Sequence, residues 1–419
     1  MEFAQAFSRV LQEQSYITDT LKTLIGIDTT NPPGENYPRL VDFLENELNH
    51  FGFDTRRIEV PKEKFRLIPE SLSGDRTNLV GVWENGKQRS TFYAHMDVVP
   101  IDDPWTEDPF GGAVKNGRLY GRGAVDMKGS IACFLGAVKV LRDLGIEPHY
   151  QMECCFCTDE EVGVYPGALH LAENGYFSNH LIWGELGAVE PVVLTGIAGS
   201  VRADITAVGK SCHSGANWLG INAIEEFIPT LNSLMELKKE VEKRESRIPA
   251  LPLPGVPSKK MTPMFNLNVI RGGVKENIVA GSCRLTINRR YLPDEKVEDV
   301  ISEIKNAVDS GRKNSNLADL QMTFRNVWSP VEIDPETDAS LKMRKAATAV
   351  LGYRDFLYGG ISGSTDLGMV LEALKPEKPR IACCGPVRGA DSRAHAADEF
   401  VLVDDLIAVT RQLVHYYAF

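Results

Sequence analysis

The chain has 419 residues, more than one compact core normally organises, so we expect at least two domains. Its 57 acidic and 46 basic side chains give a formal net charge of −11, which argues against a nucleic-acid-binding protein, since such proteins need a concentrated basic surface. Hydrophobic residues at 43% and charged residues at 25% are typical of a globular protein and exclude a disordered or collagen-like chain.

The N-terminal segment has charged residues at positions 2, 9 and 13 and lacks the apolar stretch of a secretory signal. Uncharged apolar runs elsewhere are shorter than the roughly 18 residues that a membrane span requires. We therefore expect a cytoplasmic protein that binds neither a membrane nor nucleic acid.

The first part of the chain alternates between strand and helix patterns. Helical spacing of apolar residues surrounds the breaking sequence Asn-Pro-Pro-Gly at 31–34. Because strands then alternate with helices, we predict an α/β fold with a mainly parallel, helix-covered sheet. The predicted strands are 78–83, 89–94, 150–157 and 180–183, and the predicted helices are 128–143 and 165–173.

Three of the eight cysteines, at positions 154, 155 and 157, lie in one of these predicted strands. Their spacing is not repeated at a second place, as a structural zinc site would require. We interpret them as small core residues of a buried strand.

After Pro191 the pattern changes to β-α-β-β-α-β. Five prolines between positions 249 and 263 exclude a regular element there, and the chain returns to helix, strand and helix at 335–351, 380–384 and 403–419. We therefore expect a first domain from residues 1–190 and 331–419, interrupted by an inserted α+β domain at 191–330. The predicted elements of the insert are strand 193–208, helix 221–244, strands 264–271 and 277–291, helix 293–310 and strand 320–328.

Two segments resemble nucleotide-binding motifs, but each has one residue that is incompatible with the motif. Gly121 and Gly123 begin a dinucleotide fingerprint, but Asp126 stands where its third glycine belongs and would repel a pyrophosphate. Gly209-Lys210-Ser211 ends like a phosphate-binding loop, but its first glycine is replaced by Asp204. We expect no nucleotide site at either segment.

Histidine and carboxylate side chains stand where predicted strands give way to loops, or beside a predicted helix start. Each alone has an ordinary explanation as a local ion pair, a helix cap or a solvated loop. In an open α/β sheet, however, ligands bind at the carboxyl ends of the strands. Two imidazoles and three carboxylates suit a pair of zinc ions that share one carboxylate and activate a water. The histidine and carboxylate residues at these strand ends and at the helix start are His95, Asp97, Asp126, Glu160, Glu161, Glu185 and His395, of which five would be ligands.

The ordered set of these motifs resembles the M20 metallopeptidases, and most closely their acetylornithine deacetylase and succinyl-diaminopimelate desuccinylase group. The resemblance extends over residues 21–404. It is carried by His-Met-Asp-Val-Val-Pro at 95–100, Gly-Arg-Gly at 121–123, Asp-Met-Lys-Gly at 126–129, Thr-Asp-Glu-Glu at 158–161, Gly-Glu at 184–185, Gly-Lys at 209–210 with His-Ser at 213–214, and Ala-His at 394–395 with Asp-Glu at 398–399.

The resemblance implies a dizinc site, for which Co²⁺ or Mn²⁺ could substitute. His95, Asp126 and Glu185 would hold one ion. Asp126, Glu161 and His395 would hold the other, so that Asp126 bridges the pair. Similar enzymes often have a cis peptide bond after this aspartate.

Two further residues of the same motifs would act on the reaction. Asp97 would orient His95 and fix its tautomer. Glu160 would be the general base that deprotonates the bridging water and then the acid that protonates the departing amine.

The inserted domain would resemble the family's lid and dimerisation domain, which implies a homodimer. His213 would reach across the dimer to stabilise the oxyanion. Asn277 and Arg290, or its neighbour Arg289, would hold the substrate's carbonyl and carboxylate. The motif Ser364-Thr365-Asp366 matches the family's glycine-rich substrate loop, in which Ser364 and Thr365 would contact the substrate.

The expected activity is removal of the N-acyl group from a small amino acid through a tetrahedral intermediate. Leu186 and Asn288 depart from the family pattern and weaken assignment to one particular substrate, while Glu185 in place of aspartate is typical of the deacylase and carboxypeptidase members. Two alternatives remain open: a dipeptidase or carboxypeptidase that cleaves a short peptide, and a non-catalytic metal-binding protein. Against the second, every expected catalytic position holds a competent residue.

Overall fold

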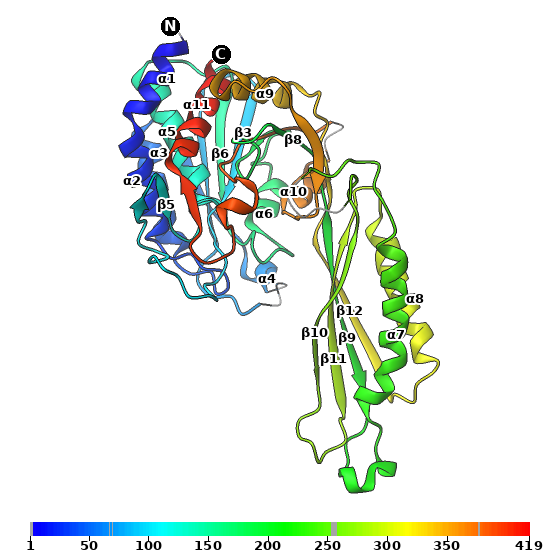
Figure 1. Cartoon of the computed structure of the whole chain (residues 1–419). Coiled ribbons are helices and arrows are strands. Elements are labelled where there is room, and N and C mark those ends of the chain that lie inside the picture. Colours follow the sequence, from blue (N-terminus) through cyan, green and yellow to red (C-terminus); the bar gives the residue numbers. More distant parts are fainter. Residues whose placement is uncertain (1–2, 67, 69, 253–257, 376–377) are drawn as a thin grey trace.

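The computed structural model describes residues 3–419 except 67, 69, 253–257 and 376–377. Figure 1 shows a large lobe, which contains both termini, and an elongated small lobe that extends away from it. We use "small lobe" for the four-stranded sheet β9 to β12 with the helices α7 and α8, and "large lobe" for the rest. No helix among the described residues has the length and apolar character needed to cross a bilayer.

A six-stranded sheet with the order β1-β2-β6-β3-β7-β15 forms the centre of the large lobe. The four strands from β6 to β15 are mutually parallel, whereas β1 and β2 add an antiparallel edge that the sequence patterns did not predict. The predicted α/β class with a mainly parallel sheet is therefore confirmed. The strands are β1 (Asp54–Glu59), β2 (Thr77–Trp83), β3 (Arg89–His95), β6 (Gln151–Cys157), β7 (His180–Trp183) and β15 (Arg380–Cys383).

Helices cover both faces of this sheet because its strands are apolar on both sides. On β3, Phe92 stacks on Phe134 of α5 with the ring centroids 4.6 Å apart, while the next residue, Tyr93, packs in the second core on the opposite face. The larger core is formed with α1 (Phe3–Gln12), α2 (Gln14–Ile25), α3 (Tyr37–His50), α5 (Lys128–Asp143), α9 (Asp338–Leu351) and α11 (Val403–Ala418), and the second with α6 (Gly167–Glu173) and α10 (Leu367–Leu374).

The cysteines at 154, 155 and 157 are free and buried in β6, as expected for core residues of a central strand. The helix α1 was not predicted, although Ala6 and Val10 give it a buried stripe at helical spacing. Short elements complete the large lobe: α4 (Lys62–Phe65), a small sheet of β4 (Val114–Lys115), β5 (Arg118–Tyr120) and β16 (Phe400–Leu402), and the 3-10 turn η2 (Gly389–Ser392).

The predicted single strand over 193–208 is two strands in different sheets. β8 (Val192–Ile197) pairs with β13 (Val331–Glu332) and β14 (Leu357–Ile361) in the large lobe, and β9 (Gly199–Val208) begins the small lobe. Gly199 allows this passage between the lobes, because a Cβ there would lie 2.5 Å from Cε1 of Tyr291. The prediction of extended structure for this apolar run was correct, but the prediction of a single continuous strand was wrong.

The small lobe has the predicted β-α-β-β-α-β order and an antiparallel sheet, β10-β11-β9-β12. α7 and α8 pack on one face of this sheet, where Ile205 and Leu285 meet Phe227 and Ile304. The segment 249–263 has no helix or strand among its described residues. The elements are β9, the 3-10 turn η1 (Ser214–Leu219), α7 (Ala223–Val241), β10 (Met264–Gly272), β11 (Ser282–Tyr291), α8 (Val297–Arg312) and β12 (Asp319–Trp328).

Candidate active site

The predicted metal ligands come from the carboxyl ends of neighbouring parallel strands. β3 ends at His95, β6 is followed by Glu160 and Glu161, and β7 is followed by Glu185. Because these strands run in the same direction, their ends meet at one edge of the sheet. The loop after β15 adds His395.

Asp126, just before α5, lies between the two imidazoles. Its Oδ1 is 3.1 Å from Nε2 of His95, and its Oδ2 is 3.1 Å from Nε2 of His395. The peptide bond that follows it, to Met127, is cis, as the resemblance implied. Each oxygen of this carboxylate therefore faces a different histidine, which is the placement expected of a bridging ligand.

Glu161 lies close to both histidines, whereas Glu185 lies near Asp126 but outside the two groups of close ligand atoms formed by the described residues. Oε1 of Glu161 lies 3.2 Å from Nε2 of His395 and receives no hydrogen bond from the described residues, although it is buried. Burial raises the pKa of Glu185 well above its usual value, and the nearby charge of Asp126 raises that pKa further. Carboxylates so crowded and so poorly solvated are stabilised by cations.

Two groups of three ligand atoms lie close enough to share an ion. His95 with Glu160 and Glu161 form one group, and Asp126 with Glu161 and His395 form the other, with all atoms of a group within 4.8 Å of one another. Imidazole nitrogens and carboxylate oxygens are donors that zinc binds readily. The donor set therefore fits a dinuclear centre.

Asp97 contacts His95 and also holds the turn that follows β6. His95 Nδ1 is 3.0 Å from the backbone oxygen of Asp97 but 3.6 Å from its carboxylate. The carboxylate instead accepts hydrogen bonds from the backbone N–H groups of Glu160, at 3.2 Å, and Glu161, at 3.0 Å. Asp97 thus orients His95 mainly through its main chain, while its side chain fixes the turn that presents both glutamates.

Glu160 lies beside the cluster, only 7% exposed, and Oε1 accepts a hydrogen bond of 3.4 Å from the backbone N–H of Asp366. Burial raises the pKa of Glu160 well above its usual range; His95 opposes this shift and the carboxylate of Asp366 adds to it. Asp366, which is held by the hydroxyl of Tyr93, was part of a quoted motif but was given no role. A carboxylate with a raised pKa is suited to accept a proton and to release it again.

Two buried residues that hold the glutamate turn, Asn31 and Arg76, were not predicted as site residues, and Asp159 of the 158–161 motif was given no role. Nδ2 of Asn31 donates to Asp97 and to Asp159, each at 3.0 Å. Nε of Arg76 lies 3.3 Å from Oδ2 of Asp159, and both side chains are fully buried. Arg76 also donates to the backbone oxygen of Gly34, at 2.7 Å, so it joins the loop before α3 to the loop after β6.

We expect Arg76→Met to lower the free energy of unfolding by about 3–5 kcal/mol, because it leaves Asp159 as an unpaired buried charge. Urea unfolding of metal-free protein measures the change. The control is Arg56→Met on β1, where the side chain is 67% exposed and the expected loss is within about 0.5 kcal/mol. Equal losses in the two variants would contradict this role of the Arg76–Asp159 pair.

A second buried ion pair holds the loop of the bridging aspartate. Arg122 Nη1 lies 2.6 Å from Oε2 of Glu399, and Oε1 of Glu399 accepts the backbone N–H groups of Val125 and Asp126 at 3.0 and 3.3 Å. Burial raises the pKa of Glu399 to about 7, although Arg122 opposes the shift. The motifs at 121–123 and 398–399 are therefore joined by the Arg122–Glu399 ion pair, which positions Asp126.

The predicted substrate-binding residues fall in two places. Arg290 donates to the hydroxyl of Ser364. Burial lowers the pKa of its guanidinium, although the charge of Glu160 opposes this shift. Arg289 points the other way: it is 1% exposed and paired with Glu295. Neighbouring residues of a strand face opposite sides, so Arg290 is the arginine of the pair that is available to a carboxylate. Thr365 is buried beside Asp366.

His213 and Asn277 lie together at the end of the small lobe, where the backbone N–H of Ser214 donates to the oxygen of Asn277 at 3.0 Å. The segment 209–222, green at the lower end of Figure 1, is the part of the small lobe farthest from the large lobe. His213 caps η1, with its Nδ1 accepting the N–H of Gly215. Within one chain, these two residues are not brought to the cluster.

Residues 91–418 match the model of the peptidase family M20/M25/M40. The chain is 26% identical to the N-formyl-4-amino-5-aminomethyl-2-methylpyrimidine deformylase of Bacillus subtilis, over 97% of this chain and 95% of that protein. It is 30% identical to an acetylornithine deacetylase of Vibrio campbellii, over 67% of this chain and 69% of that one.

A solved structure with the same fold is the M20 family metallo-carboxypeptidase Sso-CP2 from Sulfolobus solfataricus. Its TM-score is 0.78 at 18% identity, and the alignment covers 96% of this chain and 98% of that one. The family match, the relatives and the cluster at the strand ends agree with the predicted family. The chain belongs to the peptidase family M20/M25/M40 and is a metallohydrolase that acts on amide bonds.

Proposed function

We propose that the chain is a zinc-dependent amidohydrolase that removes the N-acyl group of a small amino acid. The observation that carries this proposal is the position of Glu160, a buried carboxylate with a raised pKa, beside two histidines and three carboxylates. Relatives whose names specify removal of a formyl, acetyl or succinyl group support deacylation.

The chain's own residues would hold the two ions. His95, Asp126 and Glu185 are proposed for one, and Asp126, Glu161 and His395 for the other, with Co²⁺ or Mn²⁺ as substitutes. When bound, the ions would supply an activated water and polarise the carbonyl of the scissile amide.

Glu160 would move the proton. Its carboxylate would accept a proton from the attacking water and then transfer it to the nitrogen of the departing amine. Arg290, next to Ser364 in the cleft, would bind the carboxylate of the amino acid. A substrate held in this way would present its amide to Glu160 and to the bound ions.

A panel of substrates separates deacylation from its alternative, peptide hydrolysis. With added zinc, we expect the kcat/KM for N-acetyl or N-succinyl amino acids to exceed that for dipeptides of the same amino acids. Chelators should abolish the activity. Preferred cleavage of dipeptides would assign a dipeptidase or carboxypeptidase instead, and tight binding without turnover would indicate a non-catalytic metal-binding protein.

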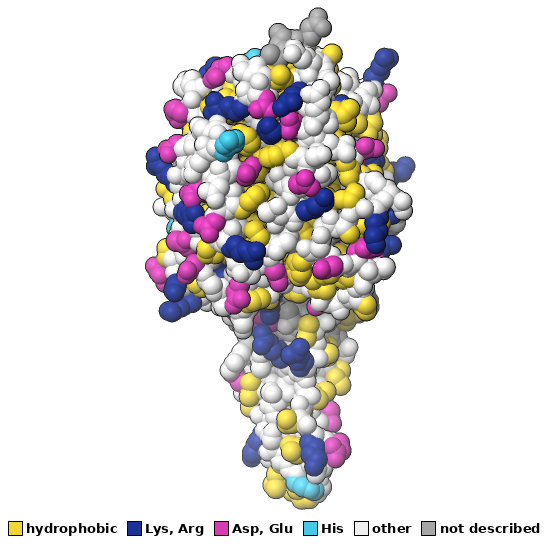
Figure 2. All heavy atoms as spheres, turned by 90° about the vertical axis from the view of Figure 1, so that its left-hand side faces the viewer, with side chains coloured by type: hydrophobic (Ala, Val, Ile, Leu, Met, Phe, Trp, Pro, Cys, Tyr) yellow, Lys and Arg dark blue, Asp and Glu magenta, His cyan; other side chains and the backbone are white. Residues whose placement is uncertain are grey.

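We also propose that residues 191–330 form an inserted lid and dimerisation domain and that the enzyme is a homodimer. The tip of the small lobe and its β10 edge expose apolar side chains, among them Trp218, at 76% exposure, and Val274, at 88%. Figure 2 shows hydrophobic and histidine side chains at this tip. An open strand edge with exposed apolar side chains is suited to pairing with a second copy.

In such a dimer His213 would serve the site of the other chain. We expect His213→Ala and Glu160→Ala each to lose activity as homodimers, and their mixed dimer to regain a part of it, because one of its two sites would be intact. Subunit exchange followed by an activity assay measures the recovery. No recovery, with mixed dimers present, would contradict a role of His213 across the dimer.

A further inference from the structure

The face of the small-lobe sheet that is free of helices is lined with arginines. On β11, Cys283, Leu285 and Ile287 pack toward the helices, so the alternate residues face the other way. The strand register places Arg202 of β9 between two partners, Asn288 on β11 and Arg325 on β12.

These arginines outnumber the carboxylates that could neutralise them. Asp204 of β9 is buried among these arginines, with 5% of its surface exposed. Its carboxylate lies 3.0 Å from Arg202, 3.0 Å from Arg284 and 3.2 Å from Arg325. Arg271 also lines the cavity above this face. In a chain with a net charge of −11, such a concentration of guanidinium groups is a local exception. Figure 2, which faces this side, shows basic side chains gathered where the small lobe meets the large lobe.

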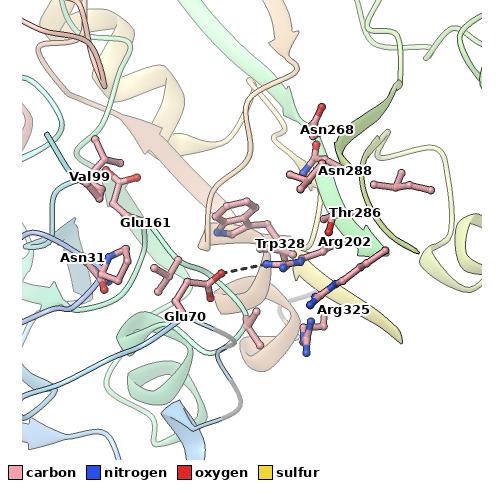
Figure 3. A pocket seen from close by; sticks show the side chains of 18 of the residues that line it. Asn31, Glu70, Val99, Glu161, Arg202, Asn268, Thr286, Asn288, Arg325 and Trp328 are labelled. Carbon is pink, nitrogen blue, oxygen red and sulfur yellow. Dashed lines mark hydrogen bonds and ion pairs between the residues drawn. The ribbon is translucent and has the colours of Figure 1, made fainter. Parts of the chain in front are cut away.

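The arginine face opens into the cleft of the active site. One cavity of about 580 Å³ is lined by Glu161 of the metal cluster and by Arg202, Arg284 and Arg325. Figure 3 shows Asn31, Val99 and Glu161 on one side of this cavity, and Asn268, Thr286 and Asn288 of the sheet on the other.

One carboxylate of the large lobe reaches the arginines across the cleft. Oε1 of Glu70 lies 3.2 Å from Nη1 of Arg202, while its Oε2 is buried and receives no hydrogen bond from the described residues. A ligand carboxylate could take the place of this half-satisfied partner, because guanidinium groups bind carboxylates and phosphates through paired hydrogen bonds.

We propose that this face is a subsite for a second anionic group of the substrate, so that the enzyme takes N-acyl amino acids or short peptides that carry an additional carboxylate or phosphate. The inference rests on the proposed function and narrows its substrate class. Arg290 pairs with Ser200, and Arg202 is two residues further along β9, a spacing of about 7 Å along the strand. The second acidic group of the substrate would therefore be separated from the carboxylate held by Arg290 by a linker of a few bonds, about the length of a short side chain or acyl chain.

Matched pairs of compounds test the effect of the added charge, and the two pairs that compare a carboxylate with its amide do so with almost no change of shape. The pairs are N-succinylalanine and its terminal amide, N-acetylglutamate and N-acetylglutamine, and N-acetylphosphoserine and N-acetylserine. The first pair places the acid on the acyl side, the second places it on the amino side, and the third replaces carboxylate by phosphate. We expect the acidic member of at least one pair to have a kcat/KM about tenfold higher or more than its neutral partner.

Two substitutions should change this preference in opposite directions. Arg325→Gln removes one guanidinium and leaves Asp204 paired with the other two, so we expect the preference to fall about fivefold or more with little change for the neutral compound. Glu70→Gln removes the competing carboxylate, so the preference should rise. Arg312→Gln, on the helix side of the same lobe, is the matched control and should change neither value. If Arg325 and Glu70 had only a structural role, Arg325→Gln and Glu70→Gln would lower kcat/KM for the acidic and the neutral compound alike.

Calorimetric binding of the same pairs to the zinc-loaded Glu160→Ala protein gives a readout that needs no turnover. Suppose that the wild type hydrolyses no compound, but that the acidic compounds bind more tightly than the neutral ones and lose this advantage in Arg325→Gln. The subsite then stands and the proposed function fails. If neutral compounds are hydrolysed and bound as well as acidic ones, or if Arg325→Gln leaves the preference unchanged, the subsite is wrong and the proposed function stands. Equal binding of both members of every pair, without turnover, would overturn both.

Discussion

Replacing Glu160 with alanine should reduce kcat by about 10²–10⁴-fold while both metal ions remain bound. The carboxylate of Glu160 is placed to take the proton of the attacking water. It is buried beside the cluster, its pKa is raised, and the backbone N–H of Asp366 donates a hydrogen bond that orients it. Steady-state kinetics together with metal analysis of the same sample measures both quantities. Glu160→Gln, which keeps the shape and removes the base, should lose as much.

The control for this prediction is Glu63→Gln, an exposed glutamate on α4, which should leave kcat unchanged. Loss of metal together with turnover in Glu160→Ala would mean that Glu160 is a ligand rather than the proton carrier. This outcome is a real alternative, because one oxygen of Glu160 lies within 4.8 Å of ligand atoms of His95 and Glu161.

Asp126→Ala should remove the dinuclear centre and, with it, all measurable activity. This carboxylate is the one that faces both His95 and His395, each at 3.1 Å, so its loss deprives both ions of a ligand at once. Metal content after dialysis against zinc, measured by plasma mass spectrometry, should fall far below that of the wild type. Asp19→Ala, in an exposed i,i+3 pair with Lys22 on α2, is the matched control.

The two variants separate the roles of the acidic residues. Asp126→Ala should lose both metal and turnover, whereas Glu160→Ala should lose turnover alone. Retention of two ions and normal kcat by Asp126→Ala would contradict a bridging role. Chelation of the wild-type protein should reproduce the Asp126→Ala phenotype, and added zinc should restore the activity of the wild type only.

The sequence predicted where most of the candidate ligands lie, because they stand after a recognisable strand or just before a helix, whereas His395 lies in a loop without such a marker. Glu160 and Glu161 follow the buried cysteine-rich strand directly, and His95 ends an apolar one. Strand direction then brings such ends together without further information. The fold class followed from the alternation of strands and helices, and the family from the resemblance of the ordered motifs.

Residues that support the site were missed because their partners are distant in the sequence. Asn31 and Arg76 carry no pattern of their own, and only the folded chain brings them to Asp97 and Asp159. The break between β8 and β9 was missed because apolar residues continue through it, although Gly196 and Gly199 marked the place.

Strand alternation could have resolved one ambiguity that the family pattern left open. Leu285, Ile287 and Arg289 are alternate residues of β11, which places Arg289 on the apolar side and Arg290 on the side of the cleft. The arginine face needed more than this, because Arg202 and Arg325 become neighbours only through the register of β9 with β12.

Anomalous scattering from crystals of the zinc-loaded protein, recorded on either side of the zinc edge, is the most direct measurement of the central claim. We expect two zinc peaks, one on each side of the Asp126 carboxylate, with His95 and Glu185 at one peak and Glu161 and His395 at the other. A single peak, or none at this edge of the sheet under saturating zinc, would contradict a dinuclear centre built from these residues.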